Sequence, residues 1–214
     1  AIVSYNGNGV SGAEIGHGIG IAPKFIQIKN RDEADGWVAY TTAVDGSLDY
    51  ITAGWNSNNA KGDSGLSVPT TTIFDIHSDD VQNNSSEDYV AYVWAEVQGF
   101  SKIGSYTGNG NADGPFIYTG FRPAWVLIKT SSYGSQNWNV YDNKRDTGNV
   151  TEVELNPNDN STDDSSGNKI DMLSNGFKGR VNYDATNRSG ETYIYMAFAE
   201  SPFVNSKGVP TNAR

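Results

Sequence analysis

The chain lacks cysteine and has little histidine, and each shortage excludes a kind of chemistry. None of its 214 residues is cysteine, so disulfide bonds and thiolate metal sites are excluded. His17 and His77 are its two histidines, and they have neither the spacing of a metal site nor a recurring Ser-His-Asp set beside them. No apolar run approaches the about 20 residues that a membrane-spanning helix needs, so membrane insertion is not expected.

Basic residues are also scarce. The chain has 15 lysines and arginines against 25 acidic residues, which gives a net charge of -10. A surface of this charge repels phosphate, so nucleic acid is not an expected partner. The acidic excess is concentrated in residues 1–100, which hold 13 acidic and 4 basic side chains. This excess favours solubility, with binding of divalent cations as the alternative.

Glycine and aromatic residues are plentiful, and the pattern they form is that of strands. The 24 glycines suit tight turns, and an aromatic share of 12% is too high for a disordered chain. Short runs of β-branched and aromatic residues, such as 25–29 and 125–129, predict strands. The longest apolar runs, 89–96 and 193–200, predict central strands of a sheet, and no long stretch keeps a helical period.

The sequence repeats itself at an offset of about 100 residues. Four blocks recur in the same order, which indicates an internal duplication. We therefore predict an all-β chain of two tandem antiparallel β-sandwich units, jelly-roll-like, over residues 1–100 and 101–214. The paired blocks are Ser4–Gly9 with Ser105–Gly110, Gly20–Lys29 with Gly120–Lys129, Trp37–Tyr40 with Trp138–Tyr141, and Asp88–Glu96 with Thr192–Glu200.

Residues 52–72 break the repeat and are predicted to form a long, exposed loop. Long loops on a β-scaffold commonly carry function. Trp55 lies in this loop with Asn56 and Asn58 close by. An indole can stack on the apolar face of a sugar while amides bind its hydroxyls, so these three residues are the candidate ligand-binding set. The alternative is that Trp55 anchors its loop to the core or to a neighbouring chain.

Residues 156–169 form the second predicted loop, which is rich in oxygen-bearing side chains. Asp159, Asp163 and Asp164 are candidate ligands for Ca²⁺, which takes six to eight oxygen atoms. Their spacing is not that of an EF-hand, so a solvated polar loop is the alternative. No other cofactor is expected.

Nothing in the sequence forms a catalytic set. Glu96 and Glu200 occupy matching places after the two longest predicted strands. Because they belong to different repeats, we expect each to do the same structural job in its own unit, unlike the facing carboxylates of a glycosidase. Glycines 16, 18 and 20 are read as turn residues, since no helix follows to receive a phosphate. The chain is therefore predicted not to be an enzyme.

Several long motifs resemble a known family. The chain is similar to an uncharacterised domain that is common in predicted virion proteins of marine tailed bacteriophages, and the similarity covers nearly all of its length. The motifs that carry it are Gly99–Gly110, Asp113–Pro123, Leu173–Lys178, Thr192–Phe203 and Val209–Arg214.

This resemblance implies a location on the virion surface and attaches no catalytic residues. We expect a non-enzymatic tail-fibre or receptor-binding module that contacts host surface glycans and assembles with copies of itself and other virion proteins. The alternative is a structural capsid decoration or stalk protein with no ligand of its own. The start at Ala1 implies either that a methionine was removed or that the chain is a piece of a longer polypeptide, and the strand-like pattern that begins at Ile2 favours the piece.

Overall fold

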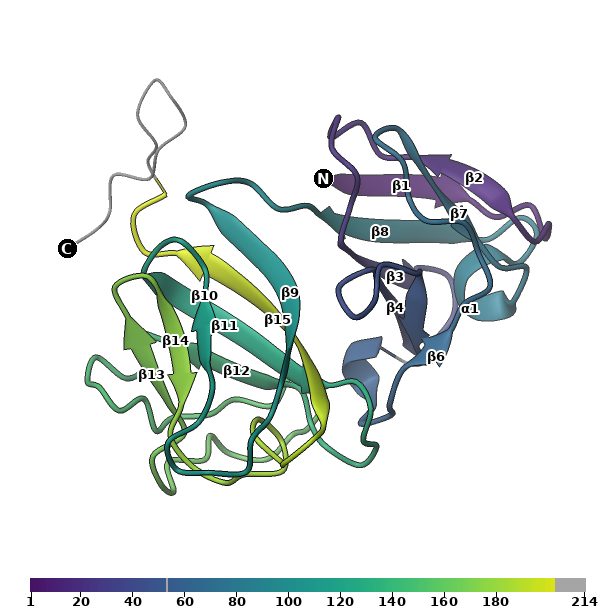
Figure 1. The fold of residues 1–214 in the computed structure, drawn as a ribbon. Coiled ribbons are helices and arrows are strands. Elements are labelled where there is room, and N and C mark those ends of the chain that lie inside the picture. The colour runs from purple at the N-terminus through teal and green to yellow at the C-terminus, as the bar shows by residue number, and fades with distance from the viewer. Residues whose placement is uncertain (53, 203–214) are drawn as a thin grey trace. The chain divides into compact units, whose positions relative to one another are not determined.

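A computed structural model describes residues 1–52 and 54–202 of the chain (Figure 1). These residues form antiparallel sheets, one single-turn helix, α1 (Asp80–Asn83), and one 3-10 turn, η1 (Gly54–Asn56), so the predicted all-β class is confirmed. The chain divides into two compact units, Ala1–Ala95 and Glu96–Arg214, here called unit 1 and unit 2. This division lies a few residues before the predicted boundary after residue 100. Phe203 and Val209–Arg214, used in the resemblance, lie outside the described residues.

Unit 1 has a large sheet of six strands and a small sheet of two. The large sheet has the order β1-β8-β3-β4-β5-β6, and β2 pairs with β7 in the small one. Core side chains come from both sheets, including Ile26 and Ile28 of the large sheet and Phe74 and Ile76 of the small one. The strands are β1 (Ile2–Asn6), β2 (Ala13–Gly16), β3 (Phe25–Asn30), β4 (Trp37–Thr41), β5 (Asp49–Ile51), β6 (Gly62–Asp63), β7 (Ile73–Ile76) and β8 (Asp88–Trp94).

Unit 2 has a large sheet of four strands, in the order β12-β11-β15-β9, and a small sheet in the order β10-β14-β13. Its core joins Val126 and Ile128 of the large sheet to Ile117, Met172 and Phe177 of the small one. The strands are β9 (Ser101–Thr107), β10 (Phe116–Tyr118), β11 (Pro123–Thr130), β12 (Asn139–Asp142), β13 (Ile170–Leu173), β14 (Gly176–Gly179) and β15 (Thr192–Ala199).

The two units share one strand order. The series β1-β8-β3-β4 of unit 1 has the same order as β9-β15-β11-β12 of unit 2, and β2-β7 corresponds to β10-β14. Details correspond as well: Tyr5 stacks on Tyr89 with ring centroids 5.3 Å apart, and Tyr106 stacks on Tyr193 at 5.1 Å. Three strands do not correspond: β5 and β6 of unit 1 are matched in unit 2 only by isolated bridges, and β13 of unit 2 has no equivalent in the small sheet of unit 1. Origin by duplication and the jelly-roll form stay predictions.

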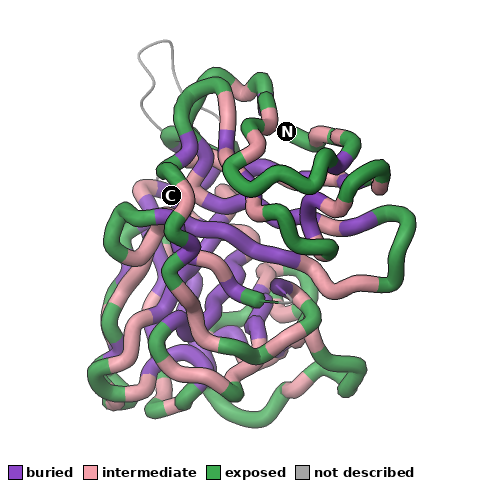
Figure 2. The backbone as a smooth tube through the Cα atoms, turned by 90° about the vertical axis from the view of Figure 1, so that its right-hand side faces the viewer, coloured by how far each residue is buried: buried purple, intermediate pink, exposed green. Residues whose placement is uncertain are grey.

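The predicted central strands and loops can be located in this architecture. The run 89–96 contributes to β8, which pairs with β1 and β3, and the run 193–200 contributes to β15, which pairs with β9 and β11. The predicted loop 52–72 includes η1 and the short strand β6. Loop 156–169 is largely exposed, and Figure 2 shows that buried residues concentrate on the strands while most connections are exposed.

Candidate functional site

Five aromatic side chains lie together on the face of unit 1's large sheet that points away from the core: Phe25, whose ring centroid lies 5.8 Å from that of Trp94, is buried, and the other four form a ring of contacts. Trp37 begins β4, Tyr92 and Trp94 alternate along β8, and Trp55 comes from η1. The ring centroids of Trp37 and Trp55 are 5.8 Å apart, those of Trp55 and Trp94 6.1 Å, those of Trp94 and Tyr92 6.1 Å, and those of Tyr92 and Trp37 6.0 Å. All four side chains are half-buried, and the contacts form a closed ring. We call this set the aromatic face.

A buried glutamine lies on the same side of the sheet. Gln27 of β3 pairs in register with Tyr92, and its side chain is fully buried. Neither its amide oxygen nor its amide nitrogen has a hydrogen-bond partner among the described residues, and the indole nitrogen of Trp55 is likewise buried without one. Each such group costs about 1–3 kcal/mol. The aromatic face therefore includes polar groups whose bonding capacity the described residues leave unused.

The turn η1 lies directly against this glutamine. A Cβ atom added to Gly54 would lie 2.5 Å from Nε2 of Gln27 and 3.0 Å from Cβ of Trp37. Gly54 also has a φ of 41°, in the left-handed region that favours glycine. Glycine at this position thus lets the backbone approach closely enough to place the indole of Trp55 beside Trp37.

The other two residues of the predicted ligand-binding set have different surroundings. Oδ1 of Asn56 accepts a hydrogen bond from the backbone N–H of Trp37 at 3.1 Å, so Asn56 fixes η1 to the start of β4. In unit 2, Oδ1 of Asn158 accepts from the N–H of Trp138 at 2.8 Å in the same way. Asn56 is therefore a positioning residue for the aromatic face, whereas the side chain of Asn58 is exposed near it.

The matching face of unit 2 differs at the place of Gln27 and Trp37. Leu127 takes the place of Gln27, since it pairs with Met196 as Gln27 pairs with Tyr92. Leu127 is buried, and Trp138 is fully buried although Trp37 is only half-buried. Trp37 and Trp138 occupy matching places in one repeated block, and Trp138 is the one enclosed by the fold. A half-exposed aromatic face over a polar residue thus occurs in unit 1 and not at the matching place in unit 2.

The three predicted Ca²⁺ ligands are not brought together. Asp159 accepts hydrogen bonds within its own turn, Asp163 pairs with Arg145 at 3.4 Å, and Asp164 pairs with Lys169 at 3.2 Å. Within residues 1–52 and 54–202, no group of three histidine or acidic side chains is arranged to hold a metal ion. The described arrangement therefore gives the metal prediction no support.

The two matching glutamates both lie in unit 2, because the division between the units falls before Glu96. Each has a basic partner: Glu96 pairs with Lys102 at 2.9 Å and Glu200 with Arg122 at 3.1 Å. The side chain of His17 is buried and lies 3.2 Å from the carbonyl oxygen of Thr70 through Nε2. Each of these three side chains thus has a partner within its own unit.

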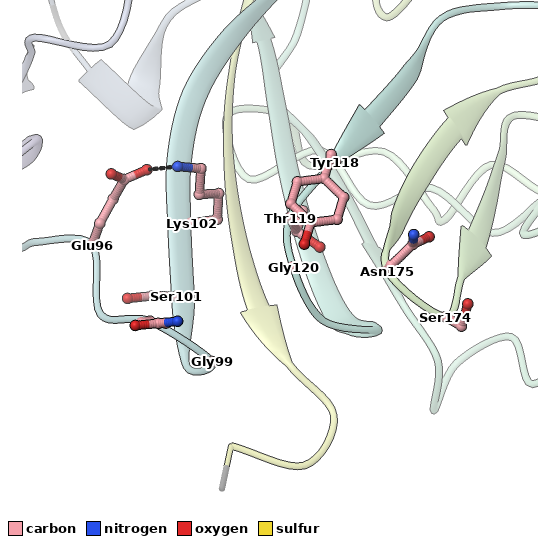
Figure 3. Close-up of a pocket in the computed structure, with 10 residues that line it drawn as sticks. Glu96, Gly99, Ser101, Lys102, Tyr118, Thr119, Gly120, Ser174 and Asn175 are labelled. Carbon is pink, nitrogen blue, oxygen red and sulfur yellow. Dashed lines mark ion pairs between the residues drawn. The ribbon is translucent and has the colours of Figure 1, made fainter. Parts of the chain in front are cut away.

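Unit 2 has an open pocket of about 500 Å³ that the sequence did not indicate. Figure 3 shows the Glu96–Lys102 ion pair on one side and Tyr118, Ser174 and Asn175 on the other. The Tyr118 side chain is 64% exposed. The charges of Glu96 and Lys102 offset each other, so this pocket suits a neutral polar ligand. Its residues look like ordinary turn residues in the sequence, and only the fold gathers them.

The fold defines an all-β protein with two units of antiparallel sheets. A family model matches residues 1–202, and the chain belongs to that family, DUF7483, a domain of unknown function. Comparison with curated proteins and with solved structures gives no match. Among the described residues no helix is long and apolar enough to cross a membrane.

Proposed function

We propose that the protein is a non-enzymatic module of a virion surface that binds host glycans through the aromatic face of unit 1. The observation that carries the proposal is the closed ring of Trp37, Trp55, Trp94 and Tyr92 around Gln27. Sugars present an apolar C–H face, which the partly exposed indoles complement, and a polar edge, which can reach the amide of Gln27 beneath them once the rings move apart. None of these five side chains is charged, so the site suits neutral sugars.

The location on a virion is supported by the resemblance of the sequence motifs and not by the geometry. In a virion, the chain would assemble with copies of itself and with other virion proteins. A tail-fibre or receptor-binding role would place the aromatic face toward the host surface.

A glycan array with the full chain tests the binding part of this proposal. We expect hits among neutral glycans, and a loss of about tenfold or more, or about 1.4 kcal/mol, in the variant Trp55→Ala. The matched control is Trp125→Ala, which removes a half-buried indole that contacts Phe198 on the corresponding sheet of unit 2. An array without hits, or equal binding by Trp55→Ala and wild type, would overturn the proposal.

Gln27→Leu gives a second, sharper test, because leucine is the residue that unit 2 has at this place. We expect this variant to bind glycans more weakly while its melting temperature stays the same or rises, since a buried unpartnered amide is removed. A variant that loses stability as well as binding would show that Gln27 is a packing residue and would contradict the assignment.

A structural decoration or stalk role is the second candidate, and exposed apolar side chains on β10 favour it. Phe116 and Tyr118 alternate on this strand with exposures of 47% and 64%, and β10 pairs on one edge only, with β14. Such a strand suits contacts with another protein. Location of the chain in a virion reconstruction would decide: β10 buried in a capsid lattice supports decoration, and a position at the tail tip supports glycan binding.

A further inference from the structure

A second pocket of about 500 Å³ opens on the core side of unit 1. Val38 and Tyr40 of β4, both members of the core, line it together with Tyr50 of β5. Asp63 and Asp79 are exposed and also line it. We call it the Tyr40 pocket. Because Tyr40 and Trp37 point to opposite faces of β4, this pocket is separate from the aromatic face.

The pocket exists where unit 1 lacks a strand that unit 2 has. In unit 2, β13 pairs with β14 and places Ile170 and Met172 in the core. In unit 1, β7 corresponds to β14, but it pairs with β2 alone and has no strand on its other edge in the place of β13. The preceding segment, 64–72, forms no strand and includes Pro69, which has no N–H to donate to a sheet.

Unit 2 fills the matching place with its own ammonium group. Nζ of Lys169, immediately before β13, lies 4.0 Å from the ring centroid of Tyr183 and 3.2 Å from a carboxylate oxygen of Asp164. Lys169 is only 6% exposed. Glu154 lies beside this group and accepts hydrogen bonds from the hydroxyls of Tyr183 and Tyr141. An ammonium held by a ring and a carboxylate thus completes this end of unit 2.

Unit 1 has the acceptors of this arrangement without the ammonium. Tyr40 corresponds to Tyr141 in the repeated block. Asp79 corresponds to Tyr183, because the carbonyl oxygen of each accepts hydrogen bonds from the backbone N–H groups three and four residues later. The hydroxyl of Tyr40 donates to Oε1 of Gln82 at 2.6 Å, and Nε2 of Gln82 donates to Asp79 at 2.7 Å, which fixes the Asp79 carboxylate. No lysine or arginine is among the described residues that line the pocket.

We propose that the Tyr40 pocket binds a primary ammonium group, at the place where unit 2 holds the ammonium of Lys169. Asp63 and Asp79 provide charge, and the rings of Tyr40 and Tyr50 provide an apolar and cation-attracting wall. The acidic excess of residues 1–100 favours the approach of a cation. The ammonium comes either from a free small amine or from a lysine side chain of a partner protein.

Titration of the full chain with n-butylammonium, followed by NMR shifts of unit 1 amides, tests the inference. n-Butanol, which has nearly the same shape without charge, is the matched ligand. We expect n-butylammonium to shift residues around the pocket and n-butanol to shift them far less. Asp79→Asn should weaken n-butylammonium binding about fivefold or more, because it removes a charge-assisted hydrogen bond. Equal shifts with both ligands would overturn the inference.

The control variant is Glu14→Gln, which removes one negative charge from an exposed position on β2. This variant should bind n-butylammonium as tightly as wild type does. If its affinity falls as much as that of Asp79→Asn, the binding depends on net charge alone, which contradicts a specific site. A short peptide with one lysine, compared with the same peptide carrying norleucine, separates the two sources. Tighter binding of the lysine peptide than of n-butylammonium assigns the site to a partner's side chain, and the reverse assigns it to a free amine.

Discussion

Lys129 is a fully buried lysine on β11 of unit 2. Its Nζ donates a hydrogen bond to the carbonyl oxygen of Thr130 at 3.0 Å, and within the described part of the chain no carboxylate forms an ion pair with it. Burial removes water from the ammonium and lowers the pKa of Lys129 from 10.5 to about 8. We therefore expect Lys129→Met to stabilise the protein at neutral pH.

The size of the effect follows from the pKa shift. A difference of about 2.5 pKa units corresponds to about 3 kcal/mol of unfolding free energy. Below pH 8 the ammonium is charged in both the folded and the unfolded chain, so the full cost of burying it is present. As pH rises from about 8 to 10.5, the folded chain loses the proton first and the cost disappears. The lost hydrogen bond to Thr130 offsets about 1 kcal/mol, which leaves an expected gain of about 2 kcal/mol at pH 7.

Urea denaturation of wild type and Lys129→Met at pH 7, 9 and 10.5 measures this gain and its decline with pH. The matched control is Lys29→Met in unit 1, because Lys29 is half-buried and its ammonium donates to the carbonyl oxygens of Asn30 and Glu33. The control should change the unfolding free energy little at any pH. If Lys129→Met lowers stability at pH 7, or if its gain does not decline with pH, the burial argument is refuted.

Two further predictions concern the small sheet of unit 2. Phe177→Ala should lower the unfolding free energy, measured by urea denaturation, by about 3–5 kcal/mol, because the Phe177 ring is buried between the rings of Tyr106 and Tyr195. A loss of less than about 1 kcal/mol would contradict this prediction. Gly176→Ala should lower the melting temperature, since its Cβ would lie 2.1 Å from the carbonyl oxygen of Ile117 and force β10 and β14 apart. Gly148→Ala, whose Cβ would approach only the Asp146 carboxylate at 3.4 Å, should change it little.

Strand positions could be predicted from the sequence because they depend on local pattern. The apolar runs that became β8 and β15 have the length and composition of central strands wherever they occur. Gln27 could not be placed in this way. It is a polar residue between two isoleucines, a pattern that normally puts the polar side chain in water, yet η1 comes from a distant part of the sequence and buries it.

The aromatic face illustrates the same limit. Trp37 and Trp138 occupy one repeated block, which predicted one role for both. Their neighbours on the next strands differ, with Tyr92 in unit 1 where unit 2 has Met196. These neighbours determine whether an indole is covered or left half-exposed. Trp55 is a candidate from its place in a polar loop, and its contacts with Trp37 and Trp94 depend on tertiary packing, which the sequence pattern does not show.

The comparison of the two units gives a physical reason to look for function in unit 1. Unit 2 has Leu127 at the place of Gln27 and Lys169 at its core end, and both are satisfied by their surroundings. At the matching places unit 1 buries Gln27 without a partner and leaves Asp79 beside an open pocket. A buried amide without a partner lowers stability, and Leu127 shows that the fold accepts an apolar side chain at the place of Gln27. Retention of Gln27 in unit 1 is expected if a ligand outside the chain completes it.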